Sequence, residues 1–218
     1  MDGEGYVEVR AVNDEIEATH AGLDMKWPIR VTGTLADQSY ALIQAVVGLR
    51  GAIGWLGPPS RVETDEWLEG VIATVAAGDG AMCTIWRDGI LVAMGSWRRD
   101  NAIYFRHLAE LIKIMVHPRA RGKQLGRIVT EALIKSAFSA GIETLQLGVR
   151  GNNHLAIELY EELGFREWGR LPNVIEDGDE RFDDVRMFLK LNQPENLILR
   201  GSSGCGPGSS PSRRRSGS

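Results

Sequence analysis

One junction constrains the fold of this chain more than any other feature: an apolar segment, Leu111–Val116, runs through a short basic loop into an amphipathic helix. The loop contains Gly122 and Gly126. Apolar residues that recur every three or four positions mark the helix: Leu125, Ile128, Val129, Ala132, Leu133 and Ala137. Such a turn points backbone N–H groups and the positive end of a helix dipole at one place, so we expect it to bind a phosphate group.

Two familiar phosphate-binding loops do not fit this junction. A P-loop has serine or threonine directly after its lysine, because that hydroxyl holds Mg²⁺, whereas Lys123 is followed by Gln124. A dinucleotide-binding turn has the pattern G-x-G-x-x-G, whereas Gly122 and Gly126 are four positions apart. The loop therefore predicts a phosphate ligand of another kind.

The loop Arg121-Gly122-Lys123-Gln124-Leu125-Gly126 resembles the Q/R-x-x-G-x-G/A pyrophosphate loop of the GNAT superfamily of acyl-CoA N-acyltransferases. A second segment, residues 152–165, is similar to the family pattern N-x-x-A-x-x-x-Y-x-x-x-G-F, with matches at Asn153, Ala156, Tyr160, Gly164 and Phe165. Two motifs in the right order are more specific than one. The resemblance covers residues 29–191.

Hydrophobic periodicity predicts a mixed α/β order of elements, which is also the order that the resemblance implies. The expected strands span 29–34, 81–87, 90–98, 103–116, 144–149, 165–168 and 182–191, and the expected helices span 36–49, 61–77, 125–140 and 153–163. Asp88-Gly89 predicts a tight hairpin turn between two of the strands. The resemblance implies a mostly antiparallel sheet with helices on both faces and splayed central strands.

The resemblance also implies acetyl-CoA as co-substrate, bound between the strand before the loop and the strand after the helix. The cofactor-binding residues that it implies are Met115, Val116, Arg121, Gly122, Lys123, Gln124, Leu125, Gly126, Arg127, Asn153 and Tyr160. It implies no metal, and the four histidines (His20, His107, His117 and His154) show no ligand spacing.

Acetyl transfer to an amine requires a group that takes the amine proton, a donor to the oxyanion, and a proton for the departing thiolate. The resemblance implies Glu110 as general base, and the apolar neighbours Leu108 and Ile112 would suit that role. His107 is the rival base. A backbone N–H near Val116 would serve the oxyanion. Tyr160 would be the general acid, with a core tyrosine as the alternative interpretation.

The acceptor is the least constrained part of this hypothesis. Carboxylates crowd the segment before the last expected strand, either as an acidic rim that attracts a cation or as a solvated hairpin loop: Glu176, Asp177, Asp179, Glu180, Asp183 and Asp184. The sequence thus predicts an N-acetyltransferase acting on a primary amine of a small cationic molecule, loosely similar to antibiotic-type members. A protein N-terminus or lysine is the alternative acceptor. Because Gln124 stands where the family usually has glycine, a CoA-binding module without catalysis is a further alternative.

Charge and composition limit which partners and which domain layout are expected. The net charge is −4, and the segment 192–218 carries four arginines and one glutamate, which leaves −7 on residues 1–191. A −7 region is a poor match for DNA or an anionic membrane, so we expect neither as a partner. We expect an acidic N-terminal arm at 1–28 with a short strand at 6–10, an N-acetyltransferase domain at 29–191, and a disordered Gly/Ser/Pro/Arg tail at 192–218.

Cysteine use and the termini favour the cytoplasm. Cys83 lies in an apolar strand and Cys205 in the tail, so a disulfide framework is not expected. The acidic N-terminus lacks the layout of a signal peptide, and no apolar run reaches the length of a membrane helix. Members of the family often form dimers, so a homodimer stays open, although no residue pattern marks an interface.

Overall fold

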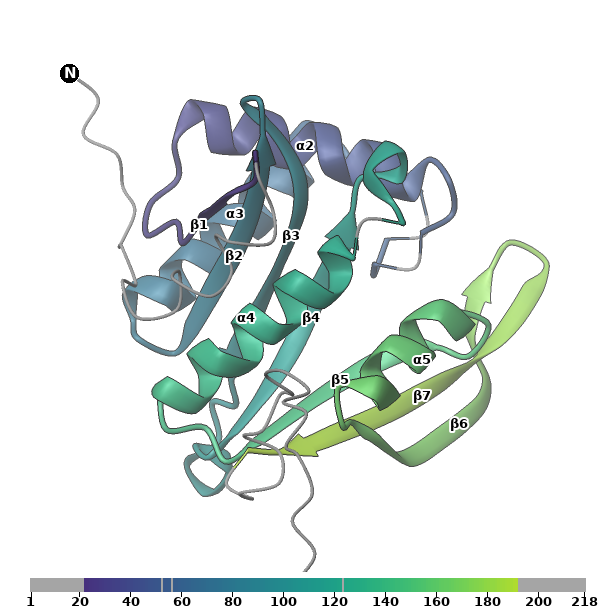
Figure 1. Cartoon of the computed structure of the whole chain (residues 1–218). Helices are drawn as coiled ribbons and strands as arrows, with labels where there is room; N and C mark the ends of the chain where they lie inside the picture. Colours follow the sequence, from purple (N-terminus) through teal and green to yellow (C-terminus); the bar gives the residue numbers. More distant parts are fainter. Residues whose placement is uncertain (1–21, 52, 56, 123, 192–218) are drawn as a thin grey trace, which may run out of the picture.

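The computed structural model of the chain describes residues 22–51, 53–55, 57–122 and 124–191 (Figure 1). These residues form one seven-stranded sheet in the order β1-β2-β3-β4-β5-β7-β6. Every neighbouring pair is antiparallel except β4 and β5, which run parallel. In chain order the helices and strands are β1 (Asp24–Lys26), α2 (Gly33–Val47), α3 (Arg61–Ala76), β2 (Gly80–Arg87), β3 (Ile90–Arg99), β4 (Leu108–Val116), α4 (Leu125–Ser139), β5 (Thr144–Arg150), α5 (His154–Glu162), β6 (Arg166–Asp177) and β7 (Glu180–Lys190).

Helices cover both faces of the sheet, as the sequence predicted. One apolar cluster joins α4 and α5 to the sheet, with Leu133 and Phe165 at its centre. The other joins α2 and α3 to the opposite face, with Leu42 and Leu68 buried there. Among the described residues, α2 and α3 pack mainly against β2, β3 and β4 and not against β5 and β7. The predicted α/β fold class is therefore confirmed.

Local signals set several element boundaries where the sequence placed them. Ser60 and Glu63 form a capping box at the start of α3, which satisfies two backbone donors. Asp88 and Gly89 both adopt positive φ and close the β2–β3 hairpin, which is the geometry that a two-residue turn requires. Gly141, at φ +75°, follows α4 and lets the chain turn into β5.

Three strand predictions were wrong in their bounds. The first strand is Asp24–Lys26, which pairs with β2, and not 29–34; part of the predicted N-terminal arm therefore belongs to the sheet. The strand predicted at 103–116 begins at Leu108, because Ile103–Phe105 form an exposed 3₁₀ turn. The strand predicted at 165–168 extends to Asp177. Residues 1–21 and 192–218, with the predicted strand at 6–10 and the predicted tail, lie outside the described residues.

The pairing between β4 and β5 is short, and this opens the sheet. It covers only Leu108–Glu110 against Thr144–Gln146. Beyond these pairs the two strands diverge, as Figure 1 shows, so that residues 111–116 and 147–150 face a gap. The predicted splay of the central strands is thus present.

A bulge shapes β4 on the side facing β3. Met94 pairs with Met115 and Ser96 with Ile112, so that one residue of β3 faces two of β4. Lys113, within the bulge, has φ +51°, a conformation that L-residues adopt at a cost. The bulge places Ile112 and Lys113 on the same face of the strand, and this positions one wall of the site described below.

Candidate active site

A large cavity of about 1320 Å³ occupies the gap between β4 and β5. Its walls come from both faces of the sheet: the loop before α4 and the helix α5 on one side, and the α2–α3 connection with Trp67 of α3 on the other. Most of the residues that the family motifs single out line it. The gap therefore connects two differently built half-sites, which we call the loop side and the connector side.

The loop side presents a helix N-terminus without a cap. Gln124, the N-cap of α4, has φ +56°, and its side chain makes no cap hydrogen bond. The first turn of α4 carries no acidic residue, and its first intrahelical hydrogen bond is donated by Ile128 to the Gln124 carbonyl. The backbone N–H groups of Leu125, Gly126 and Arg127 thus precede the helical ladder, which favours an anion at this point.

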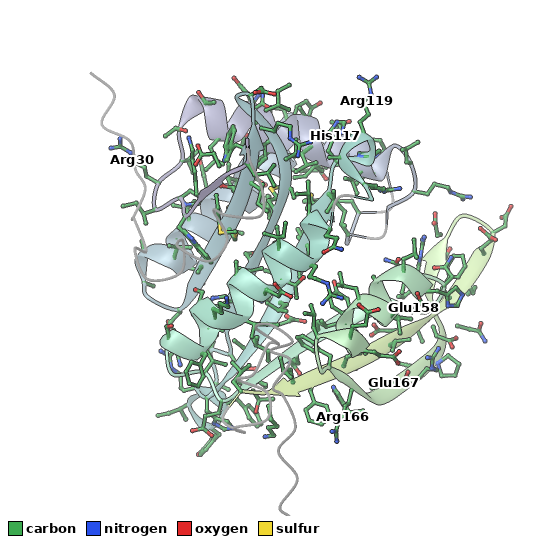
Figure 2. The ribbon with its side chains drawn as sticks, viewed as in Figure 1. Arg30, His117, Arg119, Glu158, Arg166 and Glu167 are labelled. Carbon is green, nitrogen blue, oxygen red and sulfur yellow. The ribbon has the colours of Figure 1, made fainter. Side chains whose placement is uncertain are left out.

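Gly126 keeps this helix end open toward the gap. A Cβ built there would meet Leu159 Cδ2 at 3.5 Å and Val116 Cγ2 at 3.8 Å, which are ordinary contact distances. Packing alone therefore does not require glycine, and the space in front of the residue belongs to the cavity. Arg127 is held by ion pairs with Glu131 and Glu162, whereas Arg119 in the preceding turn projects outward (Figure 2).

Tyr160 of α5 closes the loop side. It is buried against Phe165, with ring centroids 5.8 Å apart, and yet it lines the cavity. Its hydroxyl makes no hydrogen bond to another described residue, and burial raises the pKa of Tyr160 to about 12. The phenol therefore keeps its proton throughout the neutral range and faces the gap as a hydrogen-bond donor.

Asn153 precedes α5 and also lines the cavity. It is the N-cap residue of α5 by position, but its side chain makes no cap hydrogen bond. The amide instead remains available to a ligand in the gap. Asn152, beside it, accepts a hydrogen bond of 2.8 Å from Arg150.

Glu110 stands on the connector side, at the last residue where β4 and β5 still pair. Its carboxylate accepts a 2.9 Å hydrogen bond from Arg98 and lies 3.6 Å from the guanidinium of Arg186. These arginines replace the apolar surroundings that the sequence suggested for the residue. Glu110 is therefore a carboxylate within an ion-pair cluster at the narrow end of the gap.

Lys113 is a functional candidate that the sequence analysis missed. Its ammonium donates a 2.7 Å hydrogen bond to the Ile53 carbonyl and lies 3.5 Å from the ring centroid of Trp55. Trp55 packs edge-on against Trp67, with centroids 5.8 Å apart. Burial lowers the pKa of Lys113 to about 8. A lysine inside an apolar strand was the available signal, but the bulge that turns it toward the cavity has no evident mark in the sequence.

The structure brings together all the predicted site residues that it describes: Glu110, Met115, Val116, Arg121, Gly122, Gln124, Leu125, Gly126, Arg127, Asn153 and Tyr160 all line the cavity. Their individual roles stay predictions. Lys123 lies outside the described residues. His107, the rival base, is exposed and is not part of the cavity wall.

The acidic residues of the β6–β7 hairpin do not form a bare acidic rim. Five of them pair with arginines: Glu176 with Arg181, Asp177 with Arg150, Glu180 with Arg50, Asp183 with Arg170, and Asp184 with Arg186. Gly178 at positive φ forms the hairpin turn. The geometry therefore lends no support to an excess of negative charge at the mouth of the cavity.

The described residues contain neither a cluster of metal ligands nor a membrane-spanning helix. In residues 22–191, apart from positions 52, 56 and 123, no group of three or more His, Cys, Asp or Glu side chains is arranged to hold a metal ion. Over the same residues, no helix combines the length and the apolar character needed to span a membrane.

Sequence relatives were found among curated proteins. The [ribosomal protein bS18]-alanine N-acetyltransferase of Escherichia coli (strain K12) is 39% identical over 84 residues, which are 38% of this chain and 57% of that protein. The L-amino acid N-acyltransferase MnaT of the same strain is 33% identical over 101 residues, which are 46% of this chain and 57% of that protein. The chain thus spans a little over half the length of these relatives.

A solved structure and a family model complete the comparison. The putative acetyltransferase yncA from Salmonella typhimurium, solved with its cofactor acetyl-CoA, superposes with a TM-score of 0.65 at 23% identity, covering 84% of this chain and 99% of that one. At this identity the likeness shows the fold. The model of the acetyltransferase (GNAT) family matches residues 53–165, more than half of the chain. This chain therefore belongs to the acetyltransferase (GNAT) family.

Proposed function

We propose that this protein transfers acetyl from acetyl-CoA directly to a primary amine of a small molecule. The observation that carries the proposal is the gap between β4 and β5, with an uncapped helix N-terminus on one side and a carboxylate on the other. The pyrophosphate would take the N–H groups at the start of α4, beside Gly122 and Gly126. The gap would then hold the acyl arm of acetyl-CoA between the two strands.

The two faces of the gap divide the chemistry. On the connector side, Glu110 would take the proton of the incoming ammonium, directly or through water. On the loop side, the Tyr160 phenol would donate a hydrogen bond to the thiolate as the thioester breaks. A backbone N–H of β4 near Val116, which has no β5 partner there, would serve the oxyanion. The amine would thus enter on one side of the sheet, and the thiolate would leave on the other.

The relatives support an amine acceptor without fixing its class. One is named for acting on an alanine of a ribosomal protein and another for acting on L-amino acids. An α-amine is common to both. A peptide N-terminus is therefore the second candidate acceptor, and a short peptide belongs in the acceptor panel. The predicted cytoplasmic location and homodimer stay predictions.

The test is thiol release from acetyl-CoA with small amines, amino acids and short peptides, using wild-type protein, Tyr160→Phe and Glu110→Gln. We expect Tyr160→Phe to lower kcat on the order of 100-fold with little change in the KM for acetyl-CoA, because a general acid acts only on the thiolate. Glu110→Gln should lower kcat/KM for the amine, because the amide cannot take the proton of the incoming ammonium. Tight acetyl-CoA binding without thiol release, unchanged in both variants, would instead identify a binding module.

A further inference from the structure

Lys113 is a cation on the connector side that has no carboxylate partner among the described residues. Its contacts are the Ile53 carbonyl at 2.7 Å and the face of Trp55 at 3.5 Å. An ammonium has three donors, and the Ile53 oxygen accepts one of them. Lys113 lines the cavity, so a group entering there can reach the remaining donors.

The other basic side chains of this wall are already compensated. Arg98 pairs with Glu110, Arg186 with Asp184 and Glu110, and Arg150 with Asp177. Arg50, from the connection between α2 and α3, shares Asp177 and also pairs with Glu180. Together with Lys113 these are five cations against four carboxylates (Glu110, Asp177, Glu180 and Asp184). The connector side therefore has an excess of positive charge. Lys113 is the cation of this group that has no carboxylate partner among the described residues.

Lys113 and Glu110 share one face of β4 because of the bulge between them. Three residues of strand span roughly 10 Å, and both side chains are long enough to contact one ligand that lies between them. We infer that Lys113 binds an anionic group of the acceptor, so that the amine presented to Glu110 belongs to a molecule that also carries a carboxylate. This rests on the proposed function and narrows its substrate class to amino acids and similar zwitterions.

The surroundings of Lys113 suit such a ligand. Burial lowers the pKa of Lys113 to about 8, so the ammonium is still charged at neutral pH, and an added carboxylate would favour that charge. Trp55 and Trp67 supply an apolar wall beside it for the body of the acceptor. Water excluded by these rings would strengthen the ion pair.

The test compares matched acceptors that differ only in the carboxylate: free L-amino acids and their α-carboxamides. Thiol release is measured for wild-type protein, Lys113→Met and Lys113→Arg. We expect Lys113→Met to lower kcat/KM for the free acids by about 10-fold or more, as when a charge-assisted hydrogen bond is lost, and to leave the carboxamides within about twofold. Lys113→Arg should keep the preference for the acids. Each acceptor is compared with itself across variants, so its amine basicity cancels.

Four results would overturn the inference, and the last of them would also contradict the proposed function. Equal losses for acids and carboxamides in Lys113→Met would show that Lys113 only holds the connection between α2 and α3. Unchanged rates for both would show that no anion is bound there. If Lys113→Met raised the KM for acetyl-CoA and left the acceptor preference unaltered, the anion that Lys113 binds would belong to the cofactor. Wild-type protein that releases no thiol with any amine would contradict the proposed function itself.

Discussion

At the scale of single residues, Gln124 carries a conformational cost at the start of α4. Its φ of +56° lies in the left-handed region, where an L-residue costs roughly 1–2 kcal/mol. We expect Gln124→Gly to raise the free energy of unfolding by about 0.5 kcal/mol, since the greater freedom of the unfolded glycine offsets part of the relief. Gln124→Val should lower it by roughly 1–2 kcal/mol, because a β-branched side chain tolerates this φ poorly. Urea unfolding measures both.

The control for Gln124 is the same kind of change in a right-handed helix. Glu69 is an exposed residue of α3, and Glu69→Gly should lower the free energy of unfolding by about 1 kcal/mol. Equal losses in Gln124→Gly and Glu69→Gly would contradict a left-handed Gln124. The sequence identified Gln124 as a departure from the family motif, and the structure adds that the residue keeps the conformation that glycine favours.

Lys113 links stability to pH in a direction that can be checked. Burial lowers its pKa from 10.5 to about 8 in the folded protein, so between these values the unfolded chain binds more protons. Stability therefore rises with pH across this window as the cost of the buried charge is relieved. We expect the wild-type protein to gain stability relative to Lys113→Met between pH 8 and 10.5, as measured by urea unfolding. A constant difference across this range would mean that the lysine is not buried as described.

At the scale of elements, the open start of α4 should separate stability from cofactor binding. Gly126→Ala adds a methyl group at ordinary contact distances, and alanine favours the helix by up to about 1 kcal/mol. We therefore expect a more stable protein whose KM for acetyl-CoA rises about 10-fold, because the methyl group points into the space where the pyrophosphate would approach a helix N-terminus. Thermal unfolding and thiol-release kinetics measure the two effects.

Gly70 of α3 offers the matched control for Gly126. A Cβ there meets nothing within 4 Å, and the residue lies outside the large cavity. Gly70→Ala should add similar stability and leave the KM for acetyl-CoA unchanged. If Gly126→Ala also left that KM unchanged, the start of α4 would not hold the cofactor.

Elements that depend on local signals were predictable, and those that depend on tertiary pairing were not. The capping box at Ser60, the Asp88-Gly89 turn and the apolar stripe of α4 lie within short stretches of sequence. The first strand was misplaced because Asp24–Lys26 forms a strand only through its pairing with β2. The bulge at Lys113 depends on the register with β3, so the sequence alone did not show which way that side chain points.

At the scale of the whole molecule, the gap that forms the site interrupts the sheet. Strands β4 and β5 are paired over only a few residues. Strands β1–β4 pair with β5–β7 through Leu108–Glu110 of β4 and Thr144–Gln146 of β5. Beyond these residues, β4 and β5 border the cavity without pairing to each other. The sequence predicted this splay through the family motifs rather than through periodicity, because short apolar runs do not show where two parallel strands separate. The family motifs likewise predicted the position of the cavity. They did not predict its arginine-rich wall, because those arginines come from segments far apart in the chain.

A ligand that fills the gap should therefore stabilise both halves of the molecule together. Acetyl-CoA at 100 times its Kd is expected to add about 2.7 kcal/mol to the free energy of unfolding. Hydrogen exchange should slow in residues 111–116 of β4 and in residues 147–150 of β5, since both line the cavity without pairing to each other. Gly126→Ala, with its weaker binding, should need more acetyl-CoA for the same protection. Slower exchange confined to β4 would mean that the acyl arm does not lie between the strands, because a ligand held in the gap contacts both of its walls.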